Sequence, residues 1–162
     1  MLFVKRHLFL FLLLIVLLVG CNPTDNPFVT ASISPAGPDD FRNLIDGYIS
    51  NYQDGTLILS NDESYEADEP TLEIQLSKKD IREVEEKIKQ SNLKKLPDDV
   101  SVLSEDGSHY HIQVKFLDES KKVGGWNPED KNFIELHHYL FSLVDDDEYD
   151  AWLREIEEYI FN

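Results

Sequence analysis

From residue 45 onward, hydrophobic and polar positions recur with the spacings of strands and helices. Two segments rich in apolar residues, 45–52 and 56–60, are joined through Asp54 and Gly55, a dipeptide typical of hairpin turns. Residues 71–76 then alternate strictly between apolar and polar side chains. This alternation predicts a further, half-buried strand that directs every second side chain into a core.

A helix is expected directly after this strand. Ser77 is a favourable N-cap, and Asp80, three residues later, forms a variant of the capping box. The apolar positions that follow have helical spacing: Ile81, Val84 and Ile88. Pro97 ends the pattern.

A second hairpin is expected between residues 100 and 123, and its best strand covers residues 109–116. Alternation gives that strand two different faces. Its apolar side chains are Tyr110, Ile112, Val114 and Phe116, and its polar ones are His109, His111, Gln113 and Lys115. Because the apolar face needs cover, we expect helices to pack on that face and not on the histidine face.

The C-terminal third predicts two more helices. Asn127 is the expected N-cap of the first, with Pro128 at its first position, and the acidic residues 145–148 end it. Trp152 and Ile156 mark the inward side of the last helix. The order β-β-β-α-β-β-α-α has no regular βαβ alternation. We therefore predict an α+β fold with an antiparallel sheet of about five strands and three helices.

The first twenty residues follow a different pattern. Lys5 and Arg6 precede an apolar run over residues 8–19 that contains no polar side chain. The run is about a dozen residues long, whereas a membrane-spanning helix needs ~20, and it matches the hydrophobic region of a secretory signal peptide. We expect residues 1–20 to be such a signal; the alternative is an uncleaved N-terminal anchor.

The four residues that end this segment, Leu18-Val19-Gly20-Cys21, resemble the lipobox of bacterial lipoproteins. The resemblance implies that the Cys21 thiol receives a diacylglycerol and that a signal peptidase cuts between Gly20 and Cys21. It further implies attachment to the outer face of the cell membrane. In such lipoproteins the new amino group is often acylated as well, with palmitate as a typical chain, and the resemblance leaves open whether that of Cys21 is. Two acyl chains are enough for stable anchoring.

Proline content predicts how the remaining chain divides. Four prolines fall within residues 22–40, which is typical of an extended spacer. We expect residues 21–40 to form the lipidated cysteine and its spacer. Residues 41–162 are expected to form a single globular domain that acts as a monomer.

Charge and cysteine content exclude several functions. The chain has 32 Asp and Glu against 15 Lys and Arg, a net charge of −17. That balance argues against nucleic acid as a partner, because phosphate groups require basic side chains. Cys21 is the only cysteine, so an intrachain disulfide or a cysteine-based zinc site is excluded. Common nucleotide-binding, hydrolase and metalloprotease motifs are absent from the sequence.

Histidines are the candidates for a metal site. His109 and His111 are two residues apart on a predicted strand, so they face the same side at a separation of roughly 7 Å. Such a pair can supply two ligands to a transition metal. His137 and His138 are neighbours on a predicted helix and point about 100° apart. Because that helix is expected on the opposite face of the sheet, we predict no tight metal site.

Two charged segments are further candidates for binding sites. Residues 145–148 are all acidic, but Asp150 stands where an EF-hand calcium loop requires glycine. Residues 78–95 contain seven basic side chains: Lys78, Lys79, Arg82, Lys87, Lys89, Lys94 and Lys95. Four acids lie among them, which favours a solvated surface. The excess of positive charge would still suit an orientation of the domain against anionic lipid or wall polymer.

Together these patterns favour a non-enzymatic binding module at the membrane surface, with an envelope protein or wall component as its partner. No cofactor is expected beyond the lipid on Cys21. Two alternatives stay open: a metal-binding lipoprotein that uses His109 and His111, and a small envelope hydrolase. An exposed cluster of C-terminal aromatic side chains would favour the binding module.

Overall fold

A computed structural model describes residues 26–36, 46–62, 68–117 and 119–161. The predicted signal segment, its cleavage site and Cys21 lie outside the described residues. The strands are β1 (Val29–Ala36), β2 (Gly47–Asn51), β3 (Thr56–Ser60), β4 (Leu72–Gln75), β5 (Gly107–Lys115) and β6 (Ser120–Trp126). The helices are α2 (Lys78–Gln90), the short 3₁₀ helix η2 (Leu93–Lys95), α3 (Lys131–Phe141) and α4 (Asp146–Phe161).

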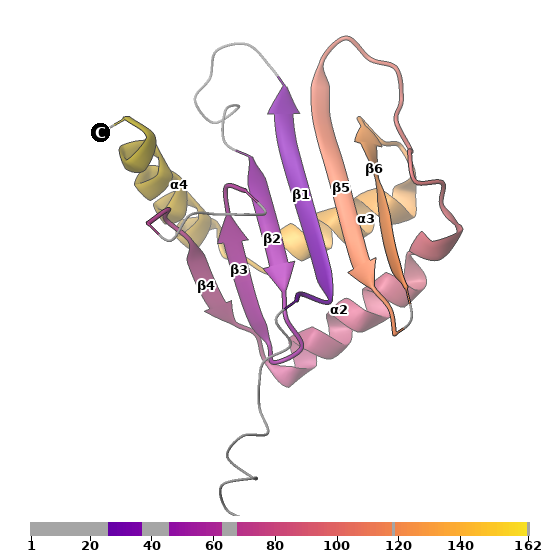
Figure 1. The fold of residues 1–162 in the computed structure, drawn as a ribbon, viewed down its shortest axis with the longest axis horizontal. Coiled ribbons are helices and arrows are strands. Elements are labelled where there is room, and N and C mark those ends of the chain that lie inside the picture. The colour runs from indigo at the N-terminus through magenta and orange to yellow at the C-terminus, as the bar shows by residue number, and fades with distance from the viewer. Residues whose placement is uncertain (1–25, 37–45, 63–67, 118, 162) are drawn as a thin grey trace, which may run out of the picture.

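The strands form one antiparallel sheet in the order β4-β3-β2-β1-β5-β6 (Figure 1). The predicted α+β class, with an antiparallel sheet and three helices, is confirmed, and the sheet has six strands instead of about five. The additional strand is β1. It lies in the middle of the sheet, where Val29 is opposite both Asn51 of β2 and Val114 of β5.

The position of β1 corrects the prediction of a spacer over residues 21–40. Pro27 precedes the strand and Pro35 lies near its end, so the prolines flank the alternating stretch between them. Val29 and Ala31 are only 1% exposed on the core side. Burial of these alternate side chains stabilises the segment as a strand despite the prolines around it.

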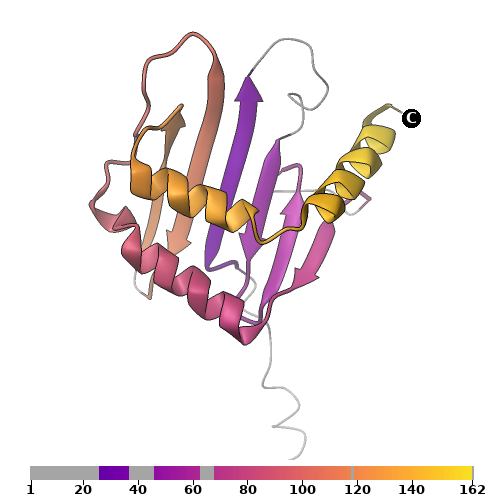
Figure 2. The same ribbon diagram turned by 180° about the vertical axis from the view of Figure 1, so that it is seen from behind.

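All three long helices lie on one face of the sheet (Figure 2). One core cluster forms beneath α2 and α3 and includes Val29, Ala31, Val84, Ile112, Phe133, Leu136 and Leu140. A second cluster forms beneath α4 and consists of Ile49, Leu57, Leu59, Val144, Trp152 and Ile156. Phe141 and Leu143 pack against both clusters. The helices therefore cover the apolar face of β5, as the alternation of residues 109–116 predicted.

The helix starts are set by side-chain caps. The capping box of Ser77 and Asp80 is present, so the predicted start of α2 is confirmed. The predicted start of α3 is wrong, because Asp130 and not Asn127 is its N-cap, with the Asp130 carboxylate accepting from the Phe133 N–H at 2.9 Å. Asn127 adopts a left-handed backbone conformation (φ 46°). Its side chain accepts from the Ser108 N–H at 2.9 Å and thus fixes the loop between β6 and α3.

The outer edge of β6 is covered by the segment that leads to β5. The Val100 N–H donates to the Gly124 carbonyl at 2.9 Å, and the Val102 N–H donates to the Trp126 carbonyl at 2.8 Å. These bonds satisfy backbone groups that a free edge strand would expose for pairing with another chain. They also fix the C-terminal end of β6, which carries Trp126.

Candidate functional site

The sheet face opposite the helices is the candidate binding surface, called the open face below. Strand alternation places there the side chains that do not enter the core. On β1 and β2 they are Thr30, Ser32, Ser34, Tyr48 and Ser50, and on β5 and β6 they are His109, His111, Gln113, Lys115, Ser120, Lys122 and Trp126. None of the described helices covers this face. It combines aromatic rings, hydroxyl groups and two lysines.

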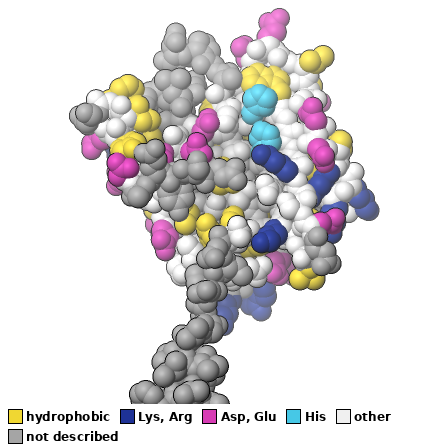
Figure 3. Space-filling model, viewed as in Figure 1, with side chains coloured by type: hydrophobic (Ala, Val, Ile, Leu, Met, Phe, Trp, Pro, Cys, Tyr) yellow, Lys and Arg dark blue, Asp and Glu magenta, His cyan; other side chains and the backbone are white. Residues whose placement is uncertain are grey.

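The two strand histidines and Trp126 form one aromatic group on the open face. The rings of His109 and His111 stack with centroids 6.3 Å apart, and the ring of Trp126 meets His109 edge-on at 4.9 Å. The Trp126 indole N–H donates to the Ser104 carbonyl at 3.1 Å, which fixes the orientation of the ring. Figure 3 shows the histidines in a column with a hydrophobic side chain above them and a basic one below.

Gly124 leaves the space on the sheet that the His111 side chain occupies. The two residues are partners across β5 and β6. A Cβ atom at Gly124 would lie 2.2 Å from Cδ2 of His111 and 2.5 Å from the Tyr110 carbonyl oxygen. The glycine thus lets the imidazole lie directly over the strand. Burial lowers the pKa of His111, and the positive charges of Lys122 and His109 lower it further.

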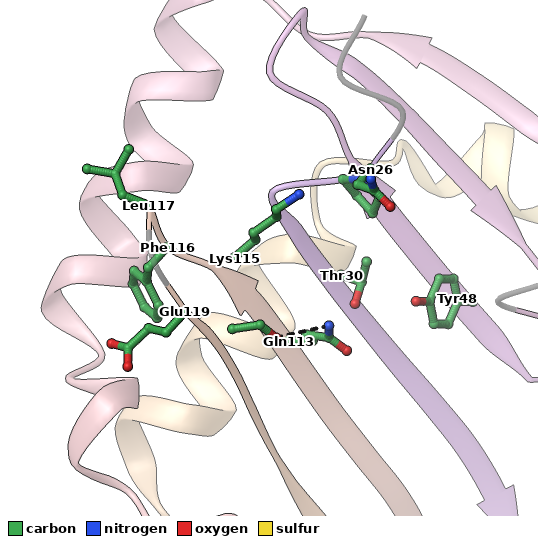
Figure 4. Close-up of a pocket in the computed structure, with 10 residues that line it drawn as sticks. Asn26, Thr30, Tyr48, Gln113, Lys115, Phe116, Leu117 and Glu119 are labelled. Carbon is green, nitrogen blue, oxygen red and sulfur yellow. Dashed lines mark hydrogen bonds between the residues drawn. The ribbon is translucent and has the colours of Figure 1, made fainter.

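Below the histidines the open face contains a shallow hollow of about 520 Å³ (Figure 4). Its lining residues are Asn26, Pro27, Thr30, Tyr48, Gln113, Lys115, Phe116, Leu117, Glu119 and Ser120. The Gln113 side-chain amide donates to the Ser120 hydroxyl at 3.2 Å and so is held against the sheet. The small side chain of Thr30 separates the larger Tyr48 and Gln113. A flat ligand would meet hydroxyl, amide and ammonium groups here.

The helix histidines do not join His109 and His111. His137 is 2% exposed on the opposite side of the sheet, where its Nε2–H donates to the Ser32 carbonyl at 2.9 Å. Its ring packs against Tyr110 and Phe141, at centroid distances of 5.0 and 4.8 Å. Burial lowers the pKa of His137 to about 4, against the weaker opposing effect of the bond to Ser32.

Other metal donors do not complete the pair of strand histidines either. In the part of the chain that the structure describes, no three His, Cys, Asp or Glu side chains are grouped so that they could hold a metal ion. The acidic residues 145–148 lie at the start of α4, where the Asp145 carboxylate accepts from the Asp147 N–H at 3.0 Å. These carboxylates cap and electrostatically favour the helix start.

Sequence reasoning identified the histidine side of β5 but missed two contributions to the open face. The hydroxyl groups of β1 were missed because residues 29–36 were assigned to the spacer. The alternation of Val29, Ala31 and Ile33 with hydroxyl-bearing residues was the signal that could have found them. The second omission was the position of Trp126 beside His109, which depends on the register of β5 and β6.

Among residues 26–36, 46–62, 68–117 and 119–161, no helix is long and apolar enough to cross a membrane. Neither the models of known protein families nor the curated proteins contain a match to this sequence.

Proposed function

We propose that this protein is a lipid-anchored module of the bacterial envelope, held at the outer face of the cell membrane through Cys21, that binds a partner with its open face. The observation that carries the binding role is the one-sided cover of the sheet. Three helices bury one face, while the opposite face presents a fixed Trp126 ring, two histidines and a hollow lined by both polar and apolar side chains. The lipobox resemblance supports the anchor.

The side chains of the open face indicate the chemistry of the partner. Lys115 and Lys122 are exposed there, in a chain whose net charge is −17. Aromatic rings such as Trp126 supply large contact area at low cost in side-chain entropy. The surface therefore suits an envelope component with acidic groups and flat or apolar parts. Binding needs no covalent step, and the function is accordingly proposed as non-enzymatic.

The anchor is tested by Cys21→Ser in the producing bacterium. Serine lacks the thiol that accepts the diacylglycerol, so the variant is expected to keep its signal segment and to lose incorporation of labelled palmitate. Because Cys21 is the only cysteine, any remaining label could not come from another thiol. A variant that fractionates, migrates and labels like the wild type would refute the anchor.

The binding role is tested with purified wall polymer and with crosslinked envelope proteins, using a triple variant of the open face. His109→Ala/Lys122→Ala/Trp126→Ala is expected to lose partners that the wild type binds. A matched control, Lys131→Ala/Glu135→Ala/His138→Ala, changes three exposed side chains on α3, on the other face. Equal binding by wild type and both variants would show that the open face is not the binding surface.

Metal binding is the second candidate, because His109 and His111 are stacked on one face with ring centroids 6.3 Å apart. Two imidazoles provide half of a structural zinc shell, and we propose only weak chelation. Calorimetric titration of the mature protein with zinc separates the two functions. Stoichiometric binding at submicromolar affinity, lost in His109→Ala/His111→Ala, would favour the metal function.

A further inference from the structure

One end of the sheet carries a basic surface with apolar residues at its centre. It forms where β5 ends, where β1 begins, and where α2 runs into η2 (Figure 1). We call it the anchor-end surface and define it by six residues: Lys89, Lys94, Lys95, Lys115, Phe116 and Leu117. Lys89, Lys115, Phe116 and Leu117 line one hollow of about 660 Å³. Lys94 and Lys95 line a neighbouring one that also contains Lys89 and Phe116.

The chain enters the domain at this same surface. Asn26, the first described residue, lines the hollow that contains Lys89 and Leu117. It is five residues after Cys21, and five residues of fully extended chain span at most about 18 Å. A lipid on Cys21 would therefore hold this end of the domain close to the membrane. The other end of β5 is farther away by the length of a nine-residue strand, about 30 Å.

The composition of the anchor-end surface matches an anionic bilayer. Four lysines are opposed by two described carboxylates, Glu85 and Glu119, in a chain that is otherwise strongly acidic. Asp118 adjoins the surface in sequence and lies outside the described residues. The Lys94 ammonium group lies 3.9 Å from the centroid of Phe116 and 2.6 Å from the Glu119 carboxylate, which neutralises that acid.

Leu117 adds an apolar contact to these charges. Its side chain is 103% exposed relative to the reference state, so it contributes nothing to the core. An exposed leucine that lines one hollow with Lys89 and Lys115 has the composition of a membrane-surface contact. In such a contact, apolar atoms enter the interface and ammonium groups remain among the phosphates.

We propose that the anchor-end surface lies directly on the anionic lipid of the membrane and thereby keeps the distant part of the open face, around His109, His111 and Trp126, away from the lipid and accessible to partners in the envelope. This proposal rests on the proposed anchoring through Cys21. It adds a fixed orientation of the domain, which a lipid on a short tether does not by itself impose.

The experiment imposes the anchor chemically, so that its result is independent of lipidation in the cell. Residues 21–162 contain every described strand and helix, and their single thiol can be coupled to a maleimide lipid in vesicles. Lysine acylation by an amine-reactive ester is then followed by mass spectrometry on phosphatidylglycerol and on phosphatidylcholine vesicles. On the anionic vesicles, acylation of Lys89 and Lys95 is expected to slow about fivefold or more. Exposed Lys131 on α3 is expected to react equally on both.

Two charge-matched variants complete the test. Lys89→Glu/Lys95→Glu is expected to abolish the protection of Lys115 on phosphatidylglycerol, whereas Lys131→Glu/Arg154→Glu is expected to retain it. Protection should also disappear at 1 M salt, where the screening length falls to about 3 Å. Equal acylation rates on the two vesicles, or equal protection of Lys131, would overturn the proposal. Failure of palmitate labelling in the cell would overturn the anchor and leave this measurement intact.

Discussion

Replacement of His137 by phenylalanine is expected to make the stability of the domain much less dependent on pH. The imidazole is buried among Tyr110, Phe133 and Phe141, and its Nε2–H donates to the Ser32 carbonyl at 2.9 Å. Its Nδ1 has no hydrogen-bond partner among the described residues. A proton added at Nδ1 would create a buried charge without a partner, which is unfavourable in a low-dielectric core.

The magnitude follows from the pKa of His137, which is about 4 in the folded protein against an ordinary value of 6.5. Between these values the unfolded chain binds more protons than the folded one, so the stability of the fold rises with pH. The contribution is fully present above pH 6.5 and is lost as the pH falls toward 4. The difference between the two pKa values corresponds to about 3 kcal/mol, a large part of the stability of a domain of this size.

Urea denaturation at several pH values between 4 and 7 measures this contribution. The wild type is expected to lose about 3 kcal/mol over that range from His137. His111, whose pKa is lowered as well, adds a smaller loss of the same sign, and so do the exposed carboxyl groups whose pKa is lowered by hydrogen bonds. His137→Phe should retain only the smaller part. His138→Gln, at the neighbouring exposed position, is the matched control and should behave like the wild type.

A loss of stability in His137→Phe that equals that of the wild type would refute this argument. A flat pH profile in His138→Gln would refute it as well. Because His138 is exposed, its replacement should leave the loss of stability that comes from His137 unchanged. The comparison uses the change with pH within each variant. It is therefore insensitive to any constant loss from removing the hydrogen bond to Ser32.

Two substitutions and one truncation test the packing, the open face and the sheet. Trp152→Ala removes a 2% exposed ring whose indole N–H donates to the Pro70 carbonyl at 3.0 Å; thermal or urea unfolding should show a loss of about 3–5 kcal/mol, with Trp152→Phe losing less. Gly124→Val places its Cβ against the His111 ring, so the NMR signals of that imidazole should shift and stability should fall by about 1–3 kcal/mol. A chain that begins at residue 41 lacks β1, the partner of β2 and β5, and calorimetry should show no cooperative unfolding; retention of a wild-type transition would mean that β1 is dispensable.

Elements with regular spacing and clear boundary residues could be predicted from the sequence. Ser77 and Asp80 identified the start of α2 because capping is a local interaction between residues three apart. The two faces of β5 followed from alternation alone. In contrast, β1 was missed because proline content was weighed above its short alternating pattern. Only the pairing of β1 with two distant strands shows why that segment is extended and buried.

The candidate site was predictable to a similar extent. His109 and His111 were found because a spacing of two on a strand fixes a common direction. The hollow beside them could not be predicted, since its residues come from β1, β2, β5 and β6 and meet only through the strand order. The separation of His137 from the strand histidines was inferred correctly, because only one face of β5 required cover by helices.

The central place of β1 also has a consequence for the order of folding. Its residues are synthesised early, yet its β5 partner begins at Gly107, more than seventy residues later. The pairing closes a long loop, which makes the formation of the sheet dependent on non-local contacts and correspondingly slow. Until residue 115 has emerged, one edge of β1 is unpaired and able to join strands of other chains. A chain that stalls before residue 115 would thus be prone to aggregation from its first strand.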